Sequence, residues 1–186
     1  MKNDFIDFNY LKSGSMKQRS TFKILNTIHI FDIIAKYNPV LVGTIPIGID
    51  IDSSDLDIIC EVYNLEEFVI LMKQEFSHFS KFKIDKVNEE ILTVNFLVDD
   101  FEIEVYAQNM KTTEQNGYRH MVIENRVLKL GGNLIRKKVI ELKRSGLKTE
   151  PAFAKILNLQ GNPYDELLEL EKFSDSHIRN LFFEEC

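Results

Sequence analysis

Two aspartates, Asp55 and Asp57, lie two residues apart at the start of an apolar run that continues to Val62. Residues two apart in a strand point to the same face, so the two carboxylates would project side by side. Carboxylates held this close repel each other unless a cation lies between them. Hard oxygen ligands suit Mg²⁺ or Mn²⁺, which keep several waters and also bind phosphate oxygens. The pair therefore predicts a divalent metal site for a phosphate-bearing substrate.

A glycine turn precedes the aspartates. The apolar residues 40–42 lead into Gly43-Thr44, and Gly48 and Ser54 follow before the aspartate pair. Because glycine lets the backbone approach a ligand closely, the backbone amides at Gly43-Thr44 and the Thr44 hydroxyl are expected to contact phosphate oxygens. The alternative is an ordinary turn after a strand, followed by a solvated pair of acids.

This spacing resembles the signature of the DNA polymerase β-like nucleotidyltransferase superfamily, in which an apolar strand, a Gly-Ser turn, a loop and an Asp-x-Asp pair follow one another. The two glycines, Ser54 and both aspartates match it, whereas Thr44 replaces the serine and Ile47 lies where a basic residue often occurs. The resemblance implies Mg²⁺ or Mn²⁺ as cofactor, an NTP as substrate, and Asp55 and Asp57 as catalytic metal ligands.

A third carboxylate is expected from a neighbouring strand. Two-metal nucleotidyl transfer activates the attacking oxygen and stabilises the leaving pyrophosphate. In the superfamily the third acid lies between apolar residues, and Glu104, between Ile103 and Val105, fits this pattern. Glu102 shares the face of Glu104 and is the second choice. The alternative is that both are solvent-facing acids of a half-buried sheet.

A calcium loop is a competing interpretation of the same acidic region. Four oxygen-bearing residues match loop positions one, three, five and twelve of an EF-hand: Asp50, Asp52, Ser54 and Glu61. The sixth position, which requires glycine, is Asp55, and the apolar residues after Asp57 indicate a strand where an EF-hand has its exiting helix. The metal pair is therefore the preferred hypothesis.

A second polar concentration covers residues 114–121. Arg119 has the planar guanidinium that suits a phosphate, and histidine, the residue type at position 120, ordinarily changes charge near neutral pH. Tyr118, Arg119 and His120 are therefore candidate nucleotide-binding residues. The alternative is a solvated helix face with one incidental histidine.

Two segments support a narrower resemblance. Residues 115–121 (QNGYRHM) and 148–154 (KTEPAFA), with the motif over 43–57, are similar to the bacterial family of unknown function DUF4269. The resemblance covers nearly the whole chain. It implies a nucleotidyltransferase-like fold, near the GrpB-like proteins, and no established substrate.

The hydrophobic periodicity predicts one domain over 1–186, with an α/β half over about 16–110 and a helical half over about 111–186. The fold class is α/β (α+β), a mixed, mostly antiparallel sheet flanked by helices, with a C-terminal helical part. The expected strands are 40–43, 55–62, 82–87, 92–98 and 101–106, with a tight turn at Asp99-Asp100. The expected helices are 16–37, 65–76, 112–130, 133–145, 150–158, 163–172 and 175–184.

The composition limits the partners. The formal net charge of -6 over 186 residues argues against broad binding to nucleic acid, although a metal can bridge acidic side chains to a nucleotide's phosphates. Neither Cys60 nor Cys186 has metal-ligand spacing. Together with the absence of a signal-peptide or membrane-spanning pattern, this predicts a cytoplasmic protein without a membrane partner.

The sequence therefore predicts a metal-dependent nucleotidyltransferase that moves a nucleotidyl group from an NTP to a hydroxyl of a small molecule or protein. The acceptor is unknown, nucleic acid is not expected, and a protein partner is possible. The alternative is a non-catalytic nucleotide-binding or interaction protein, such as an antitoxin-like one.

Overall fold

The computed structural model describes residues 5–182, which form two compact units. The first, here called the sheet unit, contains residues 5–48 and 55–118. The second, the helical unit, contains residues 49–54 and 119–182. The chain therefore leaves the sheet unit after Gly48, returns at Asp55, and leaves it again after Tyr118.

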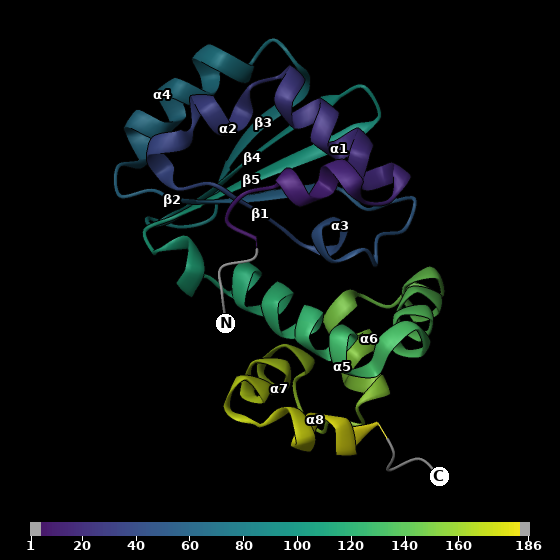
Figure 1. Cartoon of the computed structure of the whole chain (residues 1–186). Helices are drawn as coiled ribbons and strands as arrows, with labels where there is room; N and C mark the ends of the chain where they lie inside the picture. The colour runs from purple at the N-terminus through teal and green to yellow at the C-terminus, as the bar shows by residue number, and fades with distance from the viewer. Residues whose placement is uncertain (1–4, 183–186) are drawn as a thin grey trace. The chain divides into compact units, whose positions relative to one another are not determined.

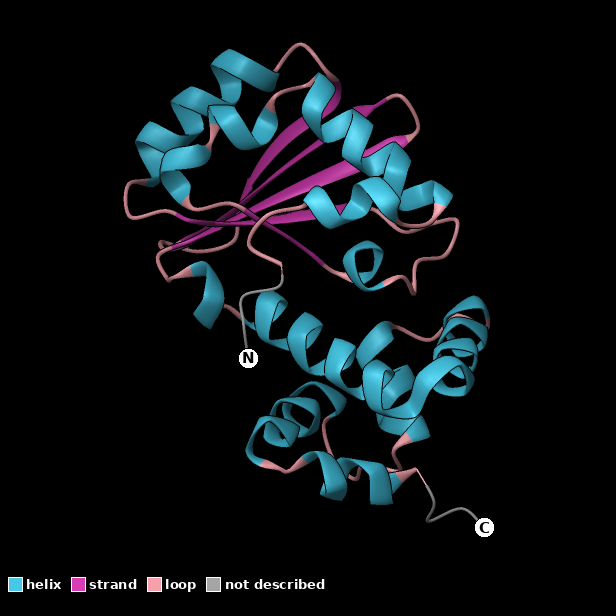
Figure 2. Ribbon diagram, in the orientation of Figure 1, coloured by secondary structure: helices cyan, strands magenta, loops and turns pink. Residues whose placement is uncertain are grey.

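The sheet unit is built on a mixed, mostly antiparallel five-stranded sheet, as the sequence predicts (Figures 1 and 2). The strands are β1 (Val40–Val42), β2 (Leu56–Glu61), β3 (Ser80–Lys86), β4 (Ile91–Val98) and β5 (Phe101–Gln108). Their order is β1-β2-β5-β4-β3. Only the β2–β5 pair is parallel, and the other three pairs are antiparallel.

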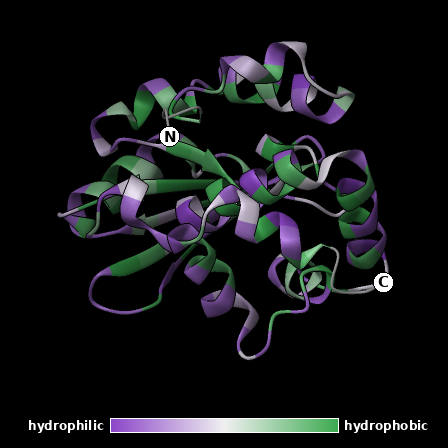
Figure 3. Cartoon of the chain, turned by 60° about the horizontal axis from the view of Figure 1, so that its bottom comes forward, coloured by the Kyte–Doolittle hydropathy of each residue, from purple (hydrophilic) through white to green (hydrophobic). Residues whose placement is uncertain are grey.

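The two faces of the sheet differ in polarity because the strands alternate. In β4 and β5, residues such as Val94, Phe96 and Val105 are buried, while their neighbours are partly exposed. Helices α1 (Met16–Thr27) and α4 (Leu65–Phe76) pack on the buried face and form one core with it (Figure 1). Green, hydrophobic residues accordingly follow the strands in Figure 3. On the opposite face, here called the polar face, β4 and β5 carry mostly polar side chains, whereas Val42 and Ile59 of β1 and β2 are buried.

The predicted helix over 16–37 is wrong in one respect, because it is three pieces. These are α1, α2 (Ile30–Ile33) and the 3₁₀ turn η2 (Ala35–Tyr37). His29 interrupts them with a left-handed φ of 52°, a conformation in which histidine is enriched among non-glycine residues. The apolar period continues across the break because Leu25, Ile30 and Ile34 all enter the same core.

The connecting segments of the sheet unit follow local capping rules. Asn64 caps α4 by accepting a hydrogen bond from the backbone N–H of Glu67 at 3.1 Å, as expected for that residue type. The remaining short helices are η1 (Asn9–Ser13), α3 (Thr44–Ile47) and η3 (Thr112–Glu114).

The helical unit contains most of the long helix α5 (Asn116–Arg144), which is kinked at Gly132 with φ 64° and ψ -155°. The kink lies at the Gly131-Gly132 break predicted between two helices. The other elements are α6 (Thr149–Ile156), α7 (Pro163–Glu169), η4 (Leu170–Lys172) and α8 (Asp175–Leu181). The end of the predicted helix 175–184 lies outside the described residues.

The predicted helix start at residue 112 is wrong, because α5 begins at Asn116. Gln115 is extended and buried, and its side-chain amide donates to the carbonyls of Cys60 at 3.0 Å and Met110 at 2.8 Å. These two bonds fasten the segment to the end of β2 and prevent a helical Gln115. No helix in residues 5–182 is long and apolar enough to cross a membrane.

Candidate functional site

Asp57 and Glu104 lie opposite each other on the two parallel strands. The register pairs Asp57 of β2 with Glu104 of β5, one step after Leu56 with Ile103. Leu56 and Ile103 enter the core, so Asp57 and Glu104 point to the polar face, where both are partly exposed. Neighbouring strands are about 4.8 Å apart, so the two carboxyl groups are within reach of a shared cation.

Asp55 completes an acidic corner of the sheet unit. It precedes β2 and is exposed. The pKa of Glu104 is raised above its ordinary value, first by burial of the carboxyl and second by the negative charge of Asp55. The structure thus pairs Asp57 with Glu104 in the register and brings Asp55 near enough to repel Glu104, a repulsion that a divalent cation would relieve.

Gly43 lies directly against Asp57. Its φ of 80° with ψ of -151° is a backbone conformation that only glycine adopts without strain. A Cβ at this position would come within 3.0 Å of the Asp57 carboxylate oxygen Oδ2. The preceding residue, Val42, is paired with Asp57 in the β1–β2 register. Gly43 is therefore required both by its turn and by the position of the Asp57 carboxylate.

The turn after Gly43 is held from the helix layer. Thr44–Ile47 form the single-turn helix α3, and the Gln18 side chain of α1 donates to the carbonyls of Ile45 at 2.8 Å and Pro46 at 3.2 Å. Ile47 is only 4% exposed, which explains why this position is apolar where the superfamily signature often has a basic residue. Thr44 is partly exposed, and its contact with phosphate stays a prediction.

Glu102, the second choice for the third acid, is engaged elsewhere. Its carboxylate accepts a hydrogen bond from the Lys81 ammonium at 2.7 Å, and both side chains are exposed. In the register Glu102 lies opposite Leu97, at the start of β5. The geometry therefore favours Glu104 as the partner of Asp57.

Glu104→Gln is expected to weaken Mn²⁺ binding by about 100-fold or more, because even residues behind a metal ligand cost 10–100-fold when replaced. It should also stabilise the metal-free protein at neutral pH. The raised pKa means that folded Glu104 keeps its proton at pH values where the unfolded chain has lost it, so stability falls as the pH rises through that window. The Glu104→Gln variant has no ionisable group at this position and therefore does not lose stability in this way as the pH rises.

Glu102→Gln is the matched control on the same face of the same strand. Mn²⁺ titrations and metal-free thermal melts from acidic to neutral pH would compare the two variants. Equal metal binding in Glu104→Gln and wild type, or a loss confined to Glu102→Gln, would remove Glu104 from the site.

The donor set fits a hard divalent cation in chemistry, since three carboxylates supply only oxygen ligands. Among residues 5–182, no three His, Cys, Asp or Glu side chains are already close enough together to hold an ion. The three carboxylates would therefore have to move closer together to form the ligand set.

The calcium-loop hypothesis is wrong. An EF-hand needs a helix after its loop, and residues Leu56–Glu61 instead form β2. Within the loop, the Ser54 hydroxyl accepts a hydrogen bond from the backbone N–H of Ile51 at 2.9 Å. Ser54 therefore stabilises its own turn, and its predicted role in nucleotide binding stays a prediction.

The three candidates of the second polar segment fall on both sides of the unit boundary. Tyr118, the last residue of the sheet unit, is 9% exposed. Arg119 makes a bidentate contact with Glu171, from Nε at 3.1 Å and from Nη2 at 2.8 Å, and the hydrogen bond raises its pKa. His120 Nε2 lies 2.9 Å from the backbone carbonyl of Tyr164. A phosphate would have to compete with Glu171 for Arg119.

Sequence reasoning missed two buried charges of α5. Glu124 is 3% exposed and Lys143 is 7% exposed. Each appears in sequence as an ordinary charge of a solvated helix face. The available signal was spacing, because Glu124 lies three and four residues from buried Met121, Val127 and Leu128.

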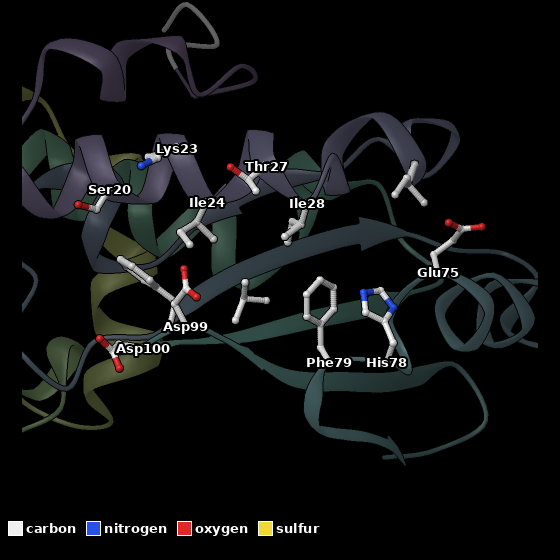
Figure 4. Close-up of a pocket in the computed structure, with 13 residues that line it drawn as sticks. Ser20, Lys23, Ile24, Thr27, Ile28, Glu75, His78, Phe79, Asp99 and Asp100 are labelled. Atoms are coloured by element: carbon white, nitrogen blue, oxygen red, sulfur yellow. The ribbon is translucent and has the colours of Figure 1, made fainter.

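A pocket of about 720 Å³ lies elsewhere in the sheet unit (Figure 4). Ile24, Ile28, Phe79 and Val98 contribute its apolar lining, and Asp99 stands at its rim. Val98 belongs to the helix-covered face of β4, whereas Glu104 lies on the other face of the sheet. The pocket is therefore separate from the acidic corner.

Solved structures of similar fold define the class. An RNA terminal uridylyl transferase, Cid1, aligns with a TM-score of 0.54 and 14% identity, covering 82% of this chain and 48% of that one. Cid1 poly(U) polymerase with Mg 3′-dATP aligns with a TM-score of 0.57 and 14% identity, covering 82% of this chain and 48% of that one. The polymerase core of TRAMP, an RNA surveillance complex, aligns with a TM-score of 0.50 and 12% identity, covering 95% of this chain and 60% of that one. The fold is therefore nucleotidyltransferase-like, and the chain spans about half the length of the first of these structures.

The family follows from the sequence match. Residues 23–170 match the domain of unknown function DUF4269, and the chain belongs to this family. A search of curated proteins gives no significant match.

Proposed function

We propose that this protein is a metal-dependent nucleotidyltransferase of the DNA polymerase β-like superfamily, which moves a nucleotidyl group from an NTP to a hydroxyl. The observation that carries the proposal is the register of Asp57 opposite Glu104 on adjacent parallel strands, beside Asp55. This acidic corner lies on the polar face of a sheet whose fold is that of nucleotidyltransferases.

Asp55, Asp57 and Glu104 would hold Mg²⁺ or Mn²⁺. When bound, the metal supplies activation of the attacking hydroxyl and charge neutralisation on the phosphates. The acceptor oxygen forms a bond to the α-phosphorus, the bond to the bridging oxygen breaks, pyrophosphate leaves, and the hydroxyl proton passes to water. Gly43 contributes by leaving room for the Asp57 carboxylate.

The acceptor is proposed to be a hydroxyl of a small molecule or protein. The solved structures of similar fold include an RNA terminal uridylyl transferase and the polymerase core of an RNA surveillance complex. Proteins bind nucleic acid largely through contacts of basic side chains with phosphates, and the formal net charge of -6 of this protein opposes such contacts. RNA is therefore included as a competing acceptor in the experiment.

A non-catalytic, antitoxin-like nucleotide-binding or interaction protein is the second candidate. It is favoured by the lack of a preassembled metal-ligating group among the described side chains and by the burial of apolar Ile47.

Thermal shift with ATP, GTP, CTP and UTP, each with Mg²⁺, with Mn²⁺ and with EDTA, tests nucleotide binding. A ligand at 100 times its Kd should stabilise the protein by about 2.7 kcal/mol. Pyrophosphate release with RNA, protein or small hydroxyl acceptors then tests turnover. Metal-dependent binding without release would favour the second candidate, and no shift with any NTP would contradict both.

Arg119→Ala is expected to weaken NTP binding far more than nucleoside binding, because only the phosphates lose a bidentate partner. Glu171→Gln is the control, since it breaks the same ion pair while keeping the guanidinium. Isothermal titration would compare both variants with wild type. If the two variants weaken NTP binding equally, Arg119 acts only through its ion pair with Glu171.

A further inference from the structure

The loop between α3 and β2 is held by a buried lysine of α5. Lys143 is 7% exposed, and its ammonium Nζ donates a hydrogen bond of 2.9 Å to the backbone carbonyl of Ile49. Both residues belong to the helical unit. Because burying an ammonium is costly unless it is paired and hydrogen-bonded, this contact is a specific feature of the fold.

A buried acid of the same helix interacts electrostatically with the lysine. Glu124, on α5, is 3% exposed, and burial raises its pKa well above the ordinary value. The negative charge of Glu150 raises that pKa further, while the positive charge of Lys143 opposes the shift, so both charges act on Glu124. Burial favours the neutral form of Glu124.

The loop Ile49–Ser54 is also held by burial of its first residue and by hydrogen bonds within its turn. Ile49 is fully buried. Two hydrogen bonds of 2.9 Å then join Ile51 to Ser54, one from Ile51 N–H to the Ser54 hydroxyl and one from Ser54 N–H to the Ile51 carbonyl. The next residue is Asp55, the most exposed member of the acidic corner.

We propose that Lys143 is a positioning residue for the carboxylate site. By holding the Ile49 carbonyl it fixes the loop Ile49–Ser54, and through the peptide bond from Ser54 to Asp55 it limits the backbone freedom of Asp55. The consequence for metal binding rests on the proposed function, whereas the tethering of the loop does not.

Lys143→Met is the test, because it keeps an unbranched apolar stem and removes the ammonium. Lys138→Met, an exposed lysine of the same helix, is the control. Hydrogen exchange by mass spectrometry should show exchange of the 50–55 amides about tenfold faster or more in Lys143→Met, with α6 and α7 still protected. Mn²⁺ affinity should fall about 10–100-fold, the range for residues that orient metal ligands.

In turnover, kcat should fall while KM for the NTP stays near the wild-type value, because Lys143 would act on the metal ligand and make no NTP contact. Lys143→Arg, which keeps charge and donor, should restore most of the loop protection. Faster exchange spread equally over α5, α6 and α7 would mean that Lys143 only stabilises the helical unit, and this would overturn the proposal.

Wild-type protein supplies a measurement that needs no variant. Mn²⁺ alone should slow exchange of the 50–55 amides, and Mn²⁺ binding without this effect would overturn the proposed coupling. If wild type binds no Mn²⁺, the metal-dependent function fails, while the exchange comparison between Lys143→Met and Lys138→Met still decides the tether. Unchanged loop exchange in Lys143→Met would reject the tether itself.

Discussion

Asp57→Asn is expected to abolish metal-dependent nucleotide binding while the protein stays folded. Asparagine keeps the size of the side chain and removes the charge that a metal ligand needs. Because replacing residues behind a ligand already costs 10–100-fold, loss of the ligand itself should cost about 100-fold or more in Mn²⁺ affinity. The metal-free protein should stay folded, since asparagine occupies the same space as the aspartate that it replaces.

Mn²⁺ titration and thermal shift with NTP and Mg²⁺ measure this result. Asp52→Asn is the matched control, because it makes the same charge change at an exposed position of the adjacent loop. An undiminished metal-dependent shift in Asp57→Asn would refute the ligand role. Loss of folding would instead make Asp57 a structural residue.

Gly43→Ala is expected to reduce both stability and metal binding. A non-glycine residue at a strained backbone position costs about 1–3 kcal/mol. The added Cβ would also meet the Asp57 Oδ2 atom within 3.0 Å, so the carboxylate must leave its present position beside Gly43. Urea unfolding and Mn²⁺ titration measure the two effects.

Gly146→Ala separates backbone strain from this collision. Gly146 has a φ of 100°, and a Cβ added there would meet no atom within 4 Å, so its replacement carries strain alone. Gly43→Ala should also reduce the free energy of unfolding less when Asp57 is already replaced by alanine. The difference, which is the interaction free energy of the two residues, should be about 0.5–3 kcal/mol, as for other residues in contact. Equal costs for Gly43→Ala with and without the Asp57 side chain would show that the carboxylate does not constrain Gly43.

Local rules predicted most of the fold. Each correct prediction depends on residues only a few positions apart in the sequence. Examples are the Asn64 cap, the alternation of β4 and β5 and the Gly131-Gly132 break, all of which the structure shows. One failure, the helix start at residue 112, came from distant partners. Gln115 is extended because its side chain donates hydrogen bonds to the carbonyls of Cys60 and Met110. The helical periodicity of the sequence could not predict these bonds.

The acidic pair was visible from spacing, whereas the choice between Glu102 and Glu104 was not. Both share a face of β5, and only the register of β5 against β2 puts Glu104 opposite Asp57. The burial of Lys143 likewise depends on Ile49, far away in the sequence. The assignment of these residues to metal and nucleotide stays a prediction.

The division of the chain between the two units affects how the protein is made. Residues 49–54 leave the ribosome early, but Lys143, which holds them, follows only after the whole sheet has been synthesised. Domains tend to fold as units during synthesis, N-terminal first, so a nascent chain would hold a sheet whose Asp55 loop is still untethered. Under the proposed role of Lys143, incomplete chains would bind metal poorly. Truncation after Tyr118 would therefore yield a fragment that lacks the loop's anchor, and the two units cannot be separated by a single cut.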